Sequence, residues 1–296
     1  MDERRLNIAV GIATAGRRAV LSETINVLAR QTRLPDLLVI CPVTLDDVDA
    51  AALVHFPAPT HIVNGAAGLP AQRNLILAEI KAADVVIFFD DDFFPHPDYL
   101  LEVEHLLADN PDVVGATGFL VADGAHGPGI SIEAGHALMS NMVKDCDTPP
   151  FELYGAYGCN MSFRLAPIRR HGILFDENLP LYGWQEDIDF SRRLAPSGKI
   201  IKSARLQGVH LGTKRGRTSG VRLGYSQVAN PIYLCRKGTF AWMRTIRFIT
   251  RNVVANIVRS VRPEPWVDRR GRLKGNLLAV SDMAIGRLSP RRILEL

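Results

Sequence analysis

A run of apolar residues that ends in three consecutive carboxylates most constrains the fold of this chain. Residues 85–92 read V-V-I-F-F-D-D-D. The apolar part, rich in branched and aromatic side chains, is typical of a buried strand. The acidic part cannot be buried unpaired, because taking charges out of water is costly. We therefore expect a core strand whose end meets cations, with a divalent metal carrying a phosphorylated ligand as the natural partner. A solvated acidic turn is the alternative.

Strand-like and helical patterns alternate over the first 120 residues. Strands are expected at 6–12, 37–41, 62–63, 85–89 and 113–119, and helices at 18–31, 68–83 and 98–108. This order predicts an α/β fold with a Rossmann-like, mostly parallel sheet flanked by helices. Residues 123–135 are expected to form a loop, and the alternation fades after about residue 154.

A second acidic segment, Y-G-W-Q-E-D-I-D-F, spans residues 182–190. A helix that starts near Trp184 would place Glu186 and Asp187 in its first turn, where the helix dipole favours anions. A carboxylate at a pocket mouth can act as a general base toward a sugar hydroxyl, and Trp184 could stack on a sugar ring. The alternative is that Glu186 and Asp189 cap the helix and pair with the arginines that follow.

Positive charge is concentrated at the C-terminal end. Residues 236–296 carry 14 Lys and Arg against 4 Asp and Glu, a balance of +10, whereas residues 1–235 have a balance of −6. The asymmetry predicts a body at 1–235 and a basic helical extension at 236–296. It suggests contact with nucleic acid or a membrane surface, and the segment carries no recognisable nucleic-acid motif.

Residues 236–262 show the pattern of an amphipathic helix. One face is expected to hold Trp242, Ile246, Ile249, Val253 and Ile257, and the opposite face Arg244, Arg247 and Arg251. Cations opposite apolar anchors are typical of a helix that lies in a membrane interface. An ordinary surface helix packed on the body is the alternative.

Several motifs in a fixed order carry a family resemblance. They are A-T-A-G-R at 13–17, G-L-P-A-Q-R-N at 68–74, D-D-D at 90–92 with prolines at 95 and 97, G-C-N-M-S-F-R at 158–164, Gly172 to Asp176, E-D-I-D-F at 186–190, and a histidine at 210. Over residues 6–212 the chain resembles the inverting family 2 glycosyltransferases of GT-A fold, of the bacterial surface-polysaccharide type. One departure leaves the nucleotide open, because the family's D-x-S turn is replaced by C-P-V-T-L-D-D at 41–47, with Asp46 as the candidate substitute.

The resemblance implies a nucleotide-sugar half at about 1–120, an acceptor half at about 121–235, and a role for each matching residue. The nucleotide-sugar contacts would be Thr14, Arg17, Arg73, Asp90 and Asp91. Asp90, Asp92 and His210 would hold Mn²⁺ or Mg²⁺, Asp187 would be the catalytic base, and Trp184 and Glu186 would contact the acceptor. Lys214, Arg215 and Arg217 could close over the diphosphate. A UDP-sugar is the favoured donor, and a saccharide or lipid-linked saccharide the expected acceptor.

Two other functions remain open at this point, a metal-dependent nucleotidyltransferase and a non-catalytic carbohydrate-binding protein. The cysteines at 41, 146, 159 and 235 show no C-x-x-C spacing, which predicts reduced thiols in a cytosolic compartment. The chain opens with charged residues and has no run of about 18 apolar residues, so neither a secretory signal nor a spanning helix is expected. We expect a protein at the cytoplasmic face of the inner membrane, peripherally bound through residues 236–262.

Overall fold

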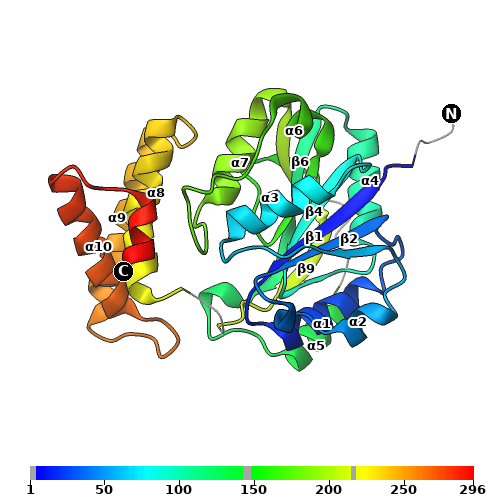
Figure 1. Cartoon of the computed structure of the whole chain (residues 1–296), viewed down its shortest axis with the longest axis horizontal. Helices are drawn as coiled ribbons and strands as arrows, with labels where there is room; N and C mark the ends of the chain where they lie inside the picture. The colour runs from blue at the N-terminus through cyan, green and yellow to red at the C-terminus, as the bar shows by residue number, and fades with distance from the viewer. Residues whose placement is uncertain (1–4, 143–147, 215–217) are drawn as a thin grey trace.

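The structure, a computed structural model, describes residues 5–142, 148–214 and 218–296 (Figure 1). An α/β body holds the sheet, and a cluster of C-terminal helices lies beside it. The sequence-based expectations for Cys146, Arg215 and Arg217 fall outside the described residues. The three described cysteines, Cys41, Cys159 and Cys235, are free thiols.

One half of the sheet is parallel, as predicted. β1 (Ile8–Thr14) lies between β2 (Leu37–Pro42) and β4 (Val85–Asp90), and β3 (Thr60–Ile62) is added outside β2. The strands of this half run in the order β3-β2-β1-β4, all in the same direction. Because the carboxyl ends of parallel strands meet at one edge, the acidic end of β4 lies beside the turn that follows β1.

The other half of the sheet mixes strand directions. β8 (Asn160–Arg164) runs antiparallel between β4 and β6 (Val113–Asp123), and β9 (Lys199–His210) runs parallel to β6. Two short strands, β5 (Phe93–Pro95) and β7 (Phe151–Glu152), pair antiparallel with β9. β9 is not among the strands expected from the sequence, because its bulged register breaks the period-2 pattern that indicates a strand.

Helices cover both faces of the sheet, and each face has its own core. α1 (Arg18–Leu28) and α4 (Tyr99–Asp109) pack on one face, and α3 (Leu69–Glu79), α6 (Leu165–His171) and α7 (Glu186–Leu194) pack on the other. α2 (Ala50–Val54) lies beside α1. The predicted loop at 123–135 is only partly a loop, since residues 124–126 form a 3-10 turn and α5 (Ile132–Ser140) begins within it.

The C-terminal helices form a separate cluster, called here the helical unit (Figure 1). It consists of α8 (Gly220–Lys237), α9 (Trp242–Ser260), α10 (Arg269–Ala284) and a final 3-10 helix at Pro290–Glu295. A Cβ atom at Gly224 would lie 2.0 Å from the carbonyl oxygen of Arg272, so α8 and α10 touch through their backbones. Residue 235, where sequence analysis divides the chain, lies inside α8. Among the described helices, none is long and apolar enough to cross a membrane.

Ion pairs between Lys237 and two aspartates attach the helical unit to the body. Lys237 Nζ lies 2.6 Å from an Asp176 carboxylate oxygen and 2.8 Å from Asp189 Oδ2. Thr239 donates a 2.7 Å hydrogen bond to Asp189 Oδ1, and Arg193 pairs with the same carboxylate. Asp189 is fully buried and pairs with Arg193, so for this residue the alternative given above, pairing with a following arginine, is confirmed. The helical unit is therefore anchored next to α7, the helix that carries Glu186 and Asp187.

Candidate active site at the carboxyl edge of the sheet

The three consecutive carboxylates at the end of β4 face different partners. Asp91 accepts hydrogen bonds from Thr14 Oγ1 at 2.7 Å and from Arg17 Nη1 at 2.8 Å. Asp92 lies on the other side, near His210, and Asp90 reaches both His210 and Arg73. Because Asp91 and Asp92 are only 4% and 1% exposed, this segment is not a solvated acidic turn.

Asp90, Asp92 and His210 form a cluster suited to a divalent cation. One ligand atom from each lies within 4.8 Å of the others. His210 Nε2 is 3.3 Å from Asp92 Oδ1 and 3.8 Å from Asp90 Oδ2. The pairing of β5 with β9 explains this proximity, because His210 lies opposite Phe93, the residue after Asp92. Two carboxylates and one imidazole are ligand types that suit Mn²⁺, with Mg²⁺ favouring the carboxylates.

Two contacts of this cluster support the fit of a metal. Within the described part of the chain, the buried Asp92 Oδ1 has no hydrogen-bond partner beyond its 3.3 Å ion pair with His210 Nε2, so it has capacity for a ligand. Asp123 Oδ1 lies 2.9 Å from His210 Nδ1 and orients the ring so that Nε2 faces the two aspartates. A carboxylate behind a metal-binding histidine commonly fixes the ring in this way.

Charge pairing compensates for the burial of these groups. Burial alone would lower the pKa of His210, but the carboxylates of Asp123 and Asp92 raise it to about 10. Burial would likewise raise the pKa of Asp92, but His210 and Arg17 hold it well below its usual range. The metal-free cluster thus holds an imidazolium cation where a metal cation would bind.

Arg73 connects the acidic strand end with the second acidic segment. Its guanidinium pairs with Glu186, contacts Asp90 Oδ1 at 3.2 Å and donates to the Gly158 carbonyl at 2.7 Å. The side chain is only 2% exposed, and its guanidinium contacts the rings of Phe88 and Phe175. Arg73 is thus a buried cation held by two carboxylates. Both carboxylates lie on other elements than α3, the helix that carries Arg73.

Asp187 and Glu186 begin α7, as predicted, with Gln185 before them at the helix N-terminus. Asp187 Oδ2 accepts a 3.0 Å hydrogen bond from the Gly158 N–H, and the Gly158 carbonyl accepts from Arg73, so the backbone of one residue contacts both side chains. The pKa of Asp187 is raised, because the effect of burial exceeds that of the backbone hydrogen bonds that lower it. Glu186 is buried, and among the described residues its Oε2 has no hydrogen-bond partner.

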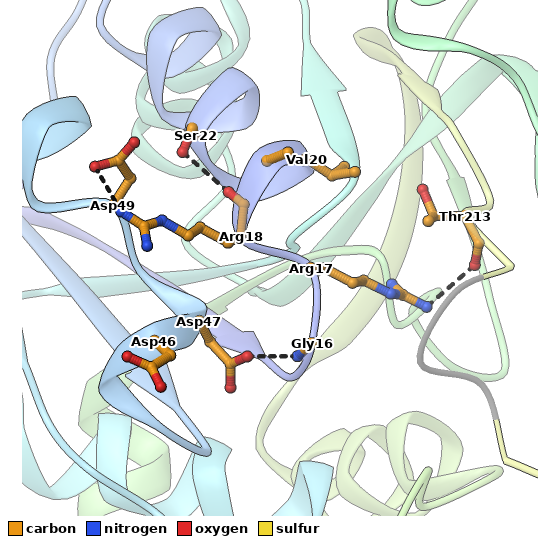
Figure 2. Close-up of a pocket in the computed structure, with 10 residues that line it drawn as sticks. Gly16, Arg17, Arg18, Val20, Ser22, Asp46, Asp47, Asp49 and Thr213 are labelled. Carbon is orange, nitrogen blue, oxygen red and sulfur yellow. Dashed lines mark hydrogen bonds and ion pairs between the residues drawn. The ribbon is translucent and has the colours of Figure 1, made fainter.

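A pocket of about 390 Å³ opens beside this cluster, at the turns that follow β1 and β2 (Figure 2). Its wall includes Arg17, Arg18, Asp46, Asp47 and Asp49. Asp47 Oδ1 accepts a 2.7 Å hydrogen bond from the Gly16 amide and joins the two turns, whereas Asp46 is exposed. A polar pocket at the carboxyl ends of parallel strands is where nucleotides bind in such sheets.

The structure brings the predicted nucleotide and metal residues, Asp187 and Glu186 into one region. Trp184, two residues before the start of α7, contacts the helical unit instead. Its ring centroid is 5.9 Å from that of Phe248 of α9, and its carbonyl oxygen accepts a hydrogen bond from Asn230 of α8. Asp123 and Asp47 are not among the site residues expected from the sequence. Asp123 ends β6 opposite His210 in the strand register, and no local sequence pattern marks that pairing.

Comparison with known proteins identifies the fold. No protein-family model and no curated protein sequence matches the chain. A mannosyltransferase of Pyrobaculum calidifontis, solved with GDP-Man and Mn²⁺, is 15% identical with a TM-score of 0.57, and the match covers 98% of this chain and 84% of that one. GalNAc-T7, solved with UDP, GalNAc and Mn²⁺, is 13% identical with a TM-score of 0.56 over 97% of this chain and 60% of that one.

A third similar structure is residues 1–349 of Staphylococcus aureus TarS with UDP-GlcNAc. It is 15% identical with a TM-score of 0.52, over 76% of this chain and 67% of that one. The match spans only about 40% of a longer TarS structure. At these identities the likeness concerns architecture. The chain has the α/β fold of GT-A glycosyltransferases, as its sequence motifs predict.

Proposed function

We propose that this protein is a metal-dependent inverting glycosyltransferase of the family 2 type. It would move a sugar from a nucleotide-diphosphate sugar, with UDP favoured, to a hydroxyl of a saccharide or lipid-linked saccharide in polysaccharide biosynthesis. The observation that carries this proposal is the meeting of Asp90, Asp92 and His210 with Arg73 and Asp187 at one edge of the sheet. The structures with UDP or GDP-Man and Mn²⁺ described above support it.

The donor side of the site would hold the nucleotide and its metal. Asp90, Asp92 and His210 would hold Mn²⁺ or Mg²⁺, which when bound neutralises charge developing on the leaving diphosphate. The nucleoside would occupy the pocket beside Gly16 and Asp47. Arg17 lines that pocket and pairs with Asp91, which also accepts a hydrogen bond from Thr14, so Arg17 is held in place by the acidic strand end.

The acceptor side would hold the attacking hydroxyl. Asp187 accepts its proton as the oxygen attacks the anomeric carbon on the face opposite the diphosphate, which inverts the configuration. A raised pKa suits this role, since a stronger base accepts the proton more readily. Glu186 Oε2 is available to a second acceptor hydroxyl, and Trp184 offers an aromatic surface for a sugar ring.

The test is turnover with a panel of nucleotide sugars in the presence of Mn²⁺. Asp187→Asn keeps the shape of the side chain but removes the proton acceptor, so the rate should fall by about 10² to 10⁴. The variant should still bind donor and metal. The exposed Asp109→Asn serves as the matched control and should leave the rate unchanged. A rate above roughly a tenth of wild type, with chemistry rate-limiting, would reassign the base, first to Glu186.

The released product separates the competing functions. Free nucleoside diphosphate is expected from glycosyl transfer, whereas pyrophosphate would indicate a nucleotidyltransferase. Binding of donor without any product would indicate a non-catalytic carbohydrate-binding protein. For the acceptor we propose a lipid-linked saccharide presented at the cytoplasmic face of the inner membrane, with the helical unit as the membrane-proximal part of the protein.

A further inference from the structure

A row of apolar side chains on α9 is exposed to solvent. Met243, Val254 and Val258 are 74%, 51% and 65% exposed. Ile246, Ile257 and Val261 lie along the same side of the helix and extend the row, with the exposed Thr250 between Ile246 and Val254. Contiguous exposed apolar surface of this kind marks an interaction site.

The opposite side of α9 is already occupied by the helical unit. Thr245 and Asn256 are buried, and Asn256 donates hydrogen bonds to Gln227 of α8 and Asn276 of α10. Ile249 and Val253 pack against the core of this unit. The face expected from the sequence was therefore partly wrong. These two residues face inward, and the exposed row is rotated from them toward Met243 and Val254.

A basic row borders the exposed apolar row. Arg247 and Arg251 are exposed, and within the described residues neither makes an ion pair or a hydrogen bond. Arg244 differs, because its guanidinium stacks 4.2 Å from the ring of Tyr154 on the body. α9 contains no acidic residue, so nothing on the helix itself balances this charge.

We infer that this face of α9 docks on the surface of an anionic lipid bilayer. The apolar row would enter the boundary between headgroups and acyl chains, with Trp242, 63% exposed, at the interface. The basic row would meet the anionic headgroups, and the +10 balance of residues 236–296 gives the whole unit the matching sign.

Other occupants fit the charges or the apolar row, but not both. A two-fold dimer through this face would bring the uncompensated arginines of two copies together, because the same patch meets itself. A nucleic acid would satisfy the arginines but would leave Val254, Ile257 and Val258 against phosphates and water.

The docking helix α9 and the residues just before it directly contact the acceptor side of the proposed active site. Phe248 of α9 contacts Trp184, and Lys237 and Thr239, which precede α9, hold Asp189 of α7. A bilayer under α9 would thus lie close to the segment that carries Glu186 and Asp187. The acceptor identity rests on the proposed function, whereas membrane binding is measured without turnover.

Vesicle flotation of the full chain tests the inference. The probe is vesicles of 30 mol% phosphatidylglycerol in phosphatidylcholine, compared with pure phosphatidylcholine. The wild type should float with the anionic vesicles at low salt and only partly dissociate at high salt, since salt screens the arginines but not the apolar row. Binding to pure phosphatidylcholine should be much weaker.

Two pairs of variants separate the two components of binding. Arg247→Gln with Arg251→Gln should lower the partition coefficient about 25-fold, roughly fivefold for each charge. Arg287→Gln with Arg291→Gln removes the same charge elsewhere on the helical unit and should have a much smaller effect. Val254→Ser with Val258→Ser should abolish the salt-resistant fraction, while Val54→Ser with Leu174→Ser, equally apolar and exposed on the body, should not.

Three results would overturn the inference. One is wild-type protein that stays at the bottom of the gradient at low salt. Another is a dimer in solution that Val254→Ser with Val258→Ser dissociates, which would make a second copy the occupant. The third is equal loss from the two arginine pairs, which would mean non-specific attraction. Donor binding, measured on the same samples, shows whether the proposed function fails independently.

Discussion

The cationic side chains of the candidate active site are buried and paired, whereas those on the exposed face of α9 are exposed and unpaired among the described residues. At the edge of the sheet, Arg17, Arg73 and His210 are buried or nearly so, and each contacts at least one carboxylate. On α9, Arg247 and Arg251 are exposed without an ion pair among the described residues. Burial forces pairing, because an unpaired charge in the interior is very unfavourable, whereas water tolerates an unpaired one.

This difference indicates where each region can change its partner. In the site, the carboxylates are already held by protein cations, so a metal must displace the proton on His210 to join them. On α9, Arg247 and Arg251 have no protein partner to give up among the described residues, so an external anionic surface can bind them directly. Substitutions in the two regions should therefore differ in effect, with the largest loss at the buried cation.

Removing the buried cation at the centre of the site should be strongly destabilising. Arg73→Met preserves packing against Phe88 and Phe175 but leaves Glu186 and Asp90 without their partner. We expect the free energy of unfolding to fall by about 3–5 kcal/mol, as for other broken buried pairs. Urea denaturation at pH 8 measures it. The loss should shrink at pH 5, because the stranded carboxylates can then take up protons, and a loss below about 1 kcal/mol would contradict the buried-pair description.

Removing the carboxylate behind His210 should weaken metal binding. Asp123→Asn removes the negative charge next to Nδ1 of the His210 ring. Loss of such a carboxylate behind a metal-binding histidine typically lowers metal affinity 10- to 100-fold. Isothermal titration with Mn²⁺ at pH 8.5 measures the effect. Tyr157→Phe, which removes only the hydroxyl that donates to the other Asp123 oxygen, is the matched control and should change the affinity far less.

Metal affinity should also rise with pH. His210 has a pKa of about 10 in the metal-free protein, so at neutral pH it must release a proton before Nε2 can bind a metal. Affinity for Mn²⁺ should therefore increase about tenfold per pH unit between pH 6.5 and 8.5. Folding of the metal-free protein has the opposite pH dependence, since the stability contributed by protonated His210 is complete below its unfolded pKa and is lost as the pH rises toward 10. In Asp123→Asn the slope should be shallower, and a flat profile in the wild type would exclude His210 as a ligand.

The smallest effect is expected where the cations are unpaired. Arg247→Gln with Arg251→Gln should change the free energy of unfolding by less than about 0.5 kcal/mol, as is usual for exposed positions. Urea denaturation of the vesicle-free protein measures it beside Arg73→Met. A loss comparable to that of Arg73→Met would mean that these arginines hold the helical unit together, and the contrast between the two regions would fail.

Local sequence patterns identified much of the fold and part of the site. The apolar run before Asp90 formed β4, and the acidic block formed the start of α7, because hydrophobic runs and helix-start signals act over a few residues. β9 was missed, because bulges interrupt its alternation and its partners β6 and β5 lie far away in the chain. The alternative role of Asp189 was also open until its distant partners, Lys237 and Thr239, were known.

The sequence by itself determined that a buried strand ends in carboxylates, that a second acidic segment follows, and that positive charge collects at the C-terminal end. Only the tertiary structure decided which cation meets which carboxylate. Arg73 pairs with Glu186 and His210 with Asp123, across 113 and 87 residues of chain. It also decided which side of α9 is exposed, because that depends on where α8 and α10 pack. Local patterns specify elements through short-range sterics and hydrophobicity, whereas pairing of buried charges depends on strand order and register, which bring distant residues together.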